Sequence, residues 1–189
     1  MLLSDKTIRE EIGTGSIVIK PFFDECVQPA SIDVHLDNKF LVFNKAKHSV
    51  IDVKKKTNDL MKEVAITDDE PFILHPGEFV LGSTLEWIKL PNHISGRIEG
   101  KSSLGRIGLL IHSTAGYVDA GWQGNLTLEL SNVSPLPITL YYKMKIGQIS
   151  FLRMTTEVLN PYGSEKLKSH YQGQKKPSQS KFHEEFEVL

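Results

Sequence analysis

From residue 17 onward, apolar residues come in short runs that are separated by Gly, Pro, Asn and Asp. No helical period of 3.6 residues continues through this region, and short runs with such punctuation are typical of β-strands. Clear runs are Phe40–Phe43, Phe72–Leu74, Phe79–Leu81 and Ile138–Tyr141. The pattern therefore predicts a mainly β fold, either a jelly roll or a distorted β-barrel.

The first residues of the chain carry a helical signature instead. Ser4 is placed to serve as an N-cap, with Leu3 and Ile8 around it as a hydrophobic staple. Gly13 is positioned to end the helix. We therefore expect one short N-terminal helix before the strands begin.

Two polar segments differ from the strand-rich regions. Residues 45–70 are rich in Lys and Asp, which predicts an exposed loop with one helical turn around Asn58 to Glu63. From Asn160 to the end the chain has few aliphatic residues, so this part cannot form a core by itself. Its composition favours a flexible, disordered tail, and the alternative is a flap that becomes ordered on a ligand. We predict a β domain over residues 1–160 and a C-terminal tail over residues 161–189.

Length and charge narrow the classes of function. A chain of 189 residues fits a single domain. Its 22 Lys and Arg residues balance 23 Asp and Glu residues, which argues against binding to a nucleic-acid polymer. Charge appears at Asp5, before a secretory segment can form, and no stretch approaches the roughly 18 apolar residues of a membrane span. We therefore expect a cytoplasmic protein with no membrane partner.

Cysteine content limits the metal chemistry. Cys26 is the only cysteine of the chain. A single thiol cannot close an internal disulfide, and it cannot build a zinc site that needs two Cys ligands.

The segment from Gly100 to Arg106 is a candidate phosphate-binding site. It contains two cations, Lys101 and Arg106, and the hydroxyls of Ser102 and Ser103. Charge-assisted donors beside glycines suit a polyphosphate, because they allow close approach of the backbone. The spacing is not that of a P-loop. The alternative is a basic β-turn whose Ser side chains cap its own backbone.

Residues 126–131 alternate cleanly between leucines on one face and Thr127, Glu129 and Ser131 on the other. Glu129 is therefore held on a rigid strand, either facing solvent or lining a pocket as a general base. Asp119 is either a ligand-binding residue or part of an Asx-turn. His112 has two open interpretations, a core histidine and a residue that orients a ligand.

Several motifs together resemble the dCTP deaminase family, which also contains the trimeric dUTPases. The resemblance extends from Leu3 to the Tyr-Gln-Gly-Gln sequence at 171–174. Its most specific motifs are Gly-Lys-Ser-Ser-Leu-Gly-Arg at 100–106, Ala-Gly-Tyr-Val-Asp at 115–119 with Gly124, Thr-Leu-Glu at 127–129 and Ile-Gly-Gln at 146–148.

This resemblance implies a jelly-roll-like domain, similar to that of the dUTPases, which assembles as a homotrimer with active sites between subunits. It assigns Glu129 as the catalytic proton shuttle and Asp119 as the partner of the deoxyribose 3′-hydroxyl. Where relatives carry a phosphate-binding Lys, this chain has His170, with Lys168 two residues earlier, so either is a candidate for that contact. The other implied substrate-binding residues are Lys101, Ser102, Ser103, Leu104, Gly105, Arg106, Thr127, Leu128, Gln148, Tyr162 and Gln174.

Gly116 and Tyr117 indicate a branch of the family. Relatives that only deaminate carry His-Arg at these positions, whereas those that also hydrolyse the triphosphate carry Gly and an aromatic residue. The resemblance therefore favours zinc-independent conversion of dCTP to dUMP, a precursor for dTMP, with ammonia and diphosphate as the other products. Mg²⁺ is expected to be held mainly by the substrate phosphates. The alternatives are a deaminase that releases dUTP, a dUTPase, and a non-catalytic trimer that binds nucleotide.

Overall fold

The computed structural model describes residues 1–57 and 59–186. Within these ranges the strands form two larger sheets and a small two-stranded pair, and the pairings between strands are antiparallel. One sheet contains, in spatial order, β5 (Met61–Ala65), β4 (Lys39–Phe43), β7 (Phe79–Lys89), β11 (Gln123–Asn132) and β9 (Leu109–Leu110), and β1 (Val18–Lys20) also pairs with β7. The other contains β10 (Tyr117–Val118), β8 (Ile94–Gly100), β13 (Lys145–Arg153), β3 (Ser31–His35) and β2 (Val27–Gln28). The small pair is β12 (Ile138–Leu140) with β6 (Phe72–Leu74).

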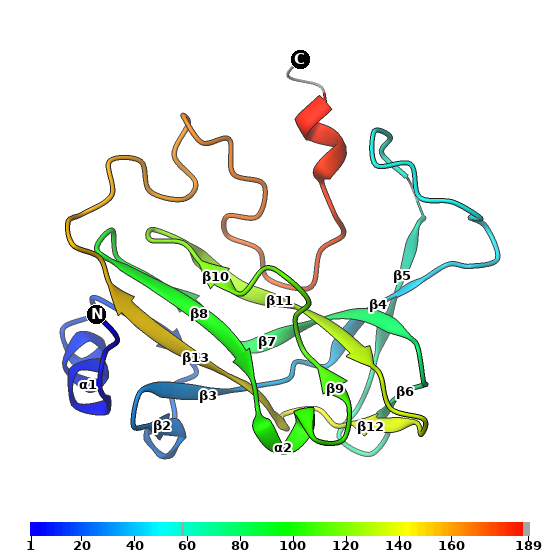
Figure 1. The fold of residues 1–189 in the computed structure, drawn as a ribbon, viewed down its shortest axis with the longest axis horizontal. Coiled ribbons are helices and arrows are strands. Elements are labelled where there is room, and N and C mark those ends of the chain that lie inside the picture. Colours follow the sequence, from blue (N-terminus) through cyan, green and yellow to red (C-terminus); the bar gives the residue numbers. More distant parts are fainter. Residues whose placement is uncertain (58, 187–189) are drawn as a thin grey trace.

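The two larger sheets lie as layers with an apolar core between them (Figure 1). Alternate residues of the strands point inward, so each sheet contributes one face to this core. Side chains that are fully buried there include Phe40, Leu128 and Leu130 from one sheet and Val34, Ile149 and Phe151 from the other. The mainly β, jelly-roll-like prediction is confirmed, with two open sheets rather than a closed barrel.

The predicted N-terminal helix is present as α1 (Asp5–Gly13). The Ser4 hydroxyl accepts a hydrogen bond from the backbone N–H of Thr7 at 3.5 Å, and Leu3 and Ile8 are both buried in the core. The end of the helix differs by two residues from the prediction. Gly13 is still helical, and Gly15 adopts the left-handed conformation at φ +75° that follows the C-cap.

The helical turn predicted around Asn58 to Glu63 is wrong, because β5 begins at Met61. Asn58 itself lies outside the described residues. β5 pairs with β4 along its whole length, and Met61 is buried against Leu41 and Leu81. This pairing between strands outweighs the local helical preference of the segment.

Shorter helical elements complete the described chain. They are η1 (Asp24–Cys26), α2 (Ser102–Gly105) and η2 (Phe182–Phe186). None of the helices in the described ranges has the length and apolarity that crossing a membrane requires.

Candidate active site

β11 shows the predicted alternation of buried and exposed residues, and one of its faces lines a pocket of about 430 Å³. Leu126, Leu128 and Leu130 are buried, whereas Thr127 and Glu129 are partly exposed and line the pocket. One carboxylate oxygen of Glu129, Oε2, accepts a hydrogen bond from the backbone N–H of Ser113 at 2.9 Å. Glu129 is therefore fixed at two points, by its strand and by the loop that precedes β10, as a proton-transfer group requires.

The remaining walls combine apolar side chains with a few polar groups, as in many small-molecule sites. The apolar part includes Phe79, Leu81, Val118, Trp122 and Leu126, and the polar part includes His112, Asp119 and Tyr117.

Asp119 lies in a turn that is closed by its backbone carbonyl rather than by its side chain as in an Asx-turn, and its contact with a ligand stays a prediction. Its carbonyl oxygen accepts a hydrogen bond from Trp122 N–H at 3.1 Å, which closes the turn between β10 and β11, and its exposed carboxylate borders the pocket. His112 lies at the pocket wall, with its Nε2 3.5 Å from Glu99 Oε2. Its ring is partly exposed at this wall rather than enclosed in the core, and a role in orienting a ligand stays a prediction.

A side chain at Gly116 would make tight contacts with its neighbours. A Cβ atom there would stand 3.3 Å from the carbonyl oxygen of Ile98 and 3.4 Å from His112 Cε1. Gly116 O also accepts a hydrogen bond from Ile98 N–H at 2.8 Å. The glycine thus keeps the loop before β10 close to β8, next to the exposed ring of Tyr117, which lies 5.7 Å from the Arg97 guanidinium carbon.

The C-terminal tail crosses the start of β11 and closes one side of the pocket. Gly173 N–H donates to Gln123 O at 2.8 Å, and Asn125 N–H donates to Gln174 O at 2.9 Å. Gln174 Nε2 donates to Thr127 Oγ1 at 3.0 Å and to Asn125 O at 2.7 Å. Composition favoured disorder for the tail, but its described residues are tied to the β domain in this way.

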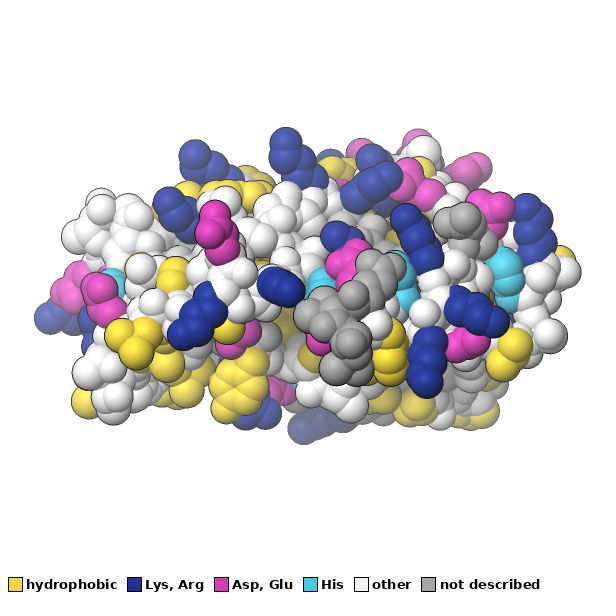
Figure 2. Space-filling model, turned by 90° about the horizontal axis from the view of Figure 1, so that it is seen from above, with side chains coloured by type: hydrophobic (Ala, Val, Ile, Leu, Met, Phe, Trp, Pro, Cys, Tyr) yellow, Lys and Arg dark blue, Asp and Glu magenta, His cyan; other side chains and the backbone are white. Residues whose placement is uncertain are grey.

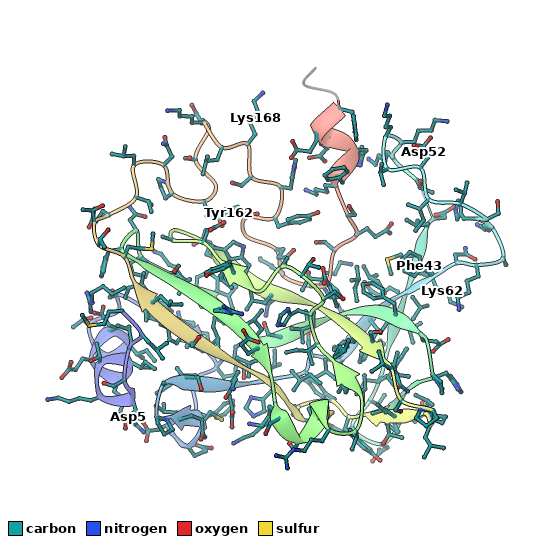
Figure 3. The ribbon with its side chains drawn as sticks, viewed as in Figure 1. Asp5, Phe43, Asp52, Lys62, Tyr162 and Lys168 are labelled. Carbon is teal, nitrogen blue, oxygen red and sulfur yellow. The ribbon has the colours of Figure 1, made fainter. Side chains whose placement is uncertain are left out.

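Tyr162 lies near the beginning of the tail, close to the turn between β10 and β11 (Figure 3). Its hydroxyl accepts a hydrogen bond from Tyr171 N–H at 3.3 Å, and burial raises the pKa of this phenol above its ordinary value. Tyr162, Tyr171 and Gln174 all line the pocket, so the structure brings these tail residues together with Glu129.

The predicted phosphate-binding segment is not part of this pocket. It forms α2, a single helical turn rather than the β-turn considered from sequence. Lys101 Nζ lies 2.5 Å from Oδ1 of the buried Asp33, and Arg106 borders a separate hollow with residues 134–139. Ser102, Ser103 and Gly105 are exposed, and Leu104 packs against the core.

Two more predicted residues occupy positions that limit their roles. The Gln148 side chain accepts a hydrogen bond from the Ser31 hydroxyl at 3.2 Å on the other sheet, away from Glu129. The Leu128 side chain is fully buried in the core, so only its backbone is available to a nucleotide.

His170 turns toward the end of the tail rather than into the pocket. Its two ring nitrogens each lie 2.8 Å from a carboxylate oxygen, Nδ1 from Glu184 and Nε2 from Glu185. Hydrogen bonding to Glu185, followed by that to Glu184, raises the pKa of His170 above its ordinary value. Lys168 projects from the outer side of the tail (Figure 3). A phosphate contact by either residue stays a prediction.

This pairing predicts a pH-dependent tail. Because the folded-state pKa of His170 is raised, the pairing is fully present below the ordinary histidine pKa of about 6.5 and is lost as pH rises through the higher folded value. An NMR titration of the His170 ring should give a pKa above that of an unpaired histidine. The double variant Glu184→Gln with Glu185→Gln should lower it, and an equal pKa in both proteins would contradict the pairing.

The face that carries the tail and the loop between β4 and β5 shows Lys and Arg interspersed with Asp and Glu (Figure 2). Lys176 pairs with Glu63 at 2.8 Å and Lys47 with Asp59 at 3.5 Å on this part of the molecule. Within the described part of the chain, no three His, Cys, Asp or Glu side chains converge as a protein-built metal site requires.

The fold and the pocket define a β protein with a small-molecule site whose central polar group is a strand-borne carboxylate. The family model for dCTP deaminase-like proteins matches residues 2–154, and the chain belongs to this family. It is 56% identical to the dUMP-forming dCTP deaminase of Mycobacterium avium and 55% identical to that of Mycobacterium tuberculosis H37Rv, over 98% of each chain. Among solved structures, the 2′-deoxycytidine 5′-triphosphate deaminase from Agrobacterium tumefaciens gives a TM-score of 0.63 at 26% identity. That match covers 79% of this chain and 46% of the other.

Proposed function

We propose that this protein converts dCTP and two water molecules to dUMP, ammonia and diphosphate. The proposal rests mainly on the placement of Glu129. Its side chain lines a pocket of nucleotide size and is oriented by a hydrogen bond from Ser113 N–H. The high identity to dUMP-forming dCTP deaminases over nearly the full chain supports the same reaction. The cytoplasmic location remains a prediction.

Deamination requires two proton movements that one carboxylate can perform in sequence. Glu129 takes a proton from the water that attacks cytosine C4 and then delivers it to the exocyclic amine, which leaves as ammonia. The hydrogen bond from Ser113 N–H holds Oε2, so the carboxylate keeps its orientation through both transfers. The apolar wall formed by Leu126 and Trp122 limits the water that reaches the base.

Triphosphate hydrolysis follows as attack of a second water on the α-phosphorus, with diphosphate as the leaving group. Asp119 borders the pocket, and we assign it to the deoxyribose 3′-hydroxyl and to orienting this water. Mg²⁺ bound through phosphate oxygens and its own water would neutralise the triphosphate charge. Gln174, held at Thr127, brings the tail toward the phosphates.

The separation of α2 from Glu129 within one chain supports a homotrimer with sites between subunits. Arg106 and the Ser102 and Ser103 hydroxyls are exposed on their own chain, where a neighbouring pocket can receive them. Exposed apolar residues flank this region and are suited to a subunit contact, namely Ile107, Leu110, Val133 and Leu136.

Mixed oligomers test this arrangement. Glu129→Gln and Arg106→Ala proteins are each expected to be nearly inactive, but equal co-expression should restore about a quarter of the sites, because each site takes one residue from each of two copies. Tagged purification of mixed trimers and an ammonia assay measure the recovery. Glu129→Gln mixed with Gln174→Ala is the control and should not recover, since both residues serve the same pocket. No recovery in the first mixture would place Arg106 and Glu129 in one chain's site.

The reaction itself is tested by its stoichiometry. With dCTP and Mg²⁺, ammonia and diphosphate should be released in equal amounts. Binding of dCTP without release of either product would instead support the nucleotide-sensing alternative.

A further inference from the structure

Gln172 connects two parts of the chain that are far apart in sequence. Its side-chain Nε2 donates to Gly121 O at 3.0 Å and to Tyr162 O at 3.1 Å. Its Oε1 accepts a hydrogen bond from Gln123 N–H at 3.0 Å. One amide group thereby joins the turn between β10 and β11 to both the beginning and the middle of the tail.

The three hydrogen bonds at position 172 require an amide side chain. Two donors and one acceptor are used, and among side chains of this length only glutamine supplies both kinds of group from one planar end. Glutamate would keep the bond from Gln123 N–H, but it would set a carboxylate against the carbonyl oxygens of Gly121 and Tyr162. All three partners are backbone atoms, so the contact fixes the path of the chain itself.

Two glycines provide the space for this arrangement. Gly163 has φ +85°, and a Cβ there would lie 2.7 Å from Gln172 Cγ and Nε2. Gly121 also has φ +85°, and a Cβ there would lie 2.5 Å from Pro161 Cβ. The turn and the tail therefore approach each other more closely than residues with side chains would allow.

The neighbours of Gln172 in the sequence reach the pocket. Tyr171 and Gln174 both line it, and Gly173 N–H pairs with Gln123 O. A shift of the tail along β11 would move Gln174 away from Thr127 and Tyr171 away from Tyr162. Because only a few hydrogen bonds fix this register, loss of the Gln172 contacts should release it.

We infer that Gln172 is a positioning residue, which sets the register of the tail so that Tyr171 and Gln174 complete the pocket around the substrate. This inference rests on the proposed turnover of dCTP. Gln172 acts through the tail and not on the reacting atoms, since it is not among the residues that line the pocket.

The test is Gln172→Glu in the full-length protein, with Glu165→Gln as the control. Glu165 is an exposed tail residue. The control therefore exchanges the same two residue types in the opposite direction, at a position to which we assign no role in the register of the tail. Two donor contacts are lost in Gln172→Glu, so we expect kcat/KM for dCTP to fall about 10-fold or more, mainly through a higher KM. Thermal unfolding of the β domain should be unchanged, and the control should behave as the wild type.

Hydrogen exchange separates this inference from the proposed function. Without nucleotide, the amides of residues 171–176 should exchange about 10-fold faster in Gln172→Glu, while those of β7 and β11 beyond Thr127 keep their rates. Unchanged exchange in the tail would overturn the inference, as would a lower kcat at constant KM, which a loss of folded protein produces. If the wild type does not turn over dCTP, the proposed function fails, whereas the exchange result still reports on the positioning.

Discussion

Replacing Glu129 with glutamine is expected to reduce ammonia release from dCTP by about 10²- to 10⁴-fold. The amide cannot accept the proton of the attacking water. Its oxygen can still accept the hydrogen bond from Ser113 N–H, so the side chain should keep its place. Ammonia release and calorimetric dCTP binding are the two measurements, and binding should remain within the measurable range.

The control for this variant is Glu157→Gln, which removes an exposed carboxylate outside the pocket. It should retain wild-type turnover. If Glu129→Gln also turned over dCTP at the wild-type rate, Glu129 would not be the proton shuttle.

Truncation before Tyr162 is expected to abolish turnover and to leave the β domain folded. The fully buried core residues lie upstream of the cut, the last of them being Phe151. The same cut removes Tyr162, Tyr171 and Gln174 from the pocket and opens it to water. Circular dichroism and thermal unfolding report the fold, and the ammonia assay reports the activity.

Two outcomes of the truncation would contradict these roles of the tail and the β domain. Full turnover by the shortened protein would show that the tail does not complete the site. Loss of cooperative unfolding would contradict the predicted division into a β domain over residues 1–160 and a tail over residues 161–189.

Local patterns predicted those parts of the fold that depend on neighbours in sequence. The alternation in β11 correctly predicted which face carries Glu129, and Ser4 correctly marked the start of α1. Strand β7 was recognised only in its first residues, because Ser83, Thr84 and Glu86 lie buried within it and interrupt the apolar pattern. Two of these polar groups have distant partners that sequence spacing does not reveal. Glu86 pairs with His35, and the Thr84 hydroxyl accepts a hydrogen bond from Leu126 N–H.

The site shows the same limit. Family resemblance brought Thr127, Glu129, Asp119, Tyr162 and Gln174 into one set, and the structure gathers them at one pocket. Trp122, the N–H of Ser113 and the side chain of Gln172 were missed. Backbone donors carry no sequence signal, and the Tyr-Gln-Gly-Gln motif, which includes Gln172, does not show which of its residues faces the pocket.

In the proposed reaction, dCTP becomes dUMP at one site without release of dUTP. The direct measurement is turnover of labelled dCTP with Mg²⁺ in the presence of excess unlabelled dUTP, followed by chromatographic separation of the nucleotides over time. The label is expected to pass to dUMP and not to enter the dUTP pool. Accumulation of the label in dUTP, in proportion to the ammonia released, would contradict the proposed reaction.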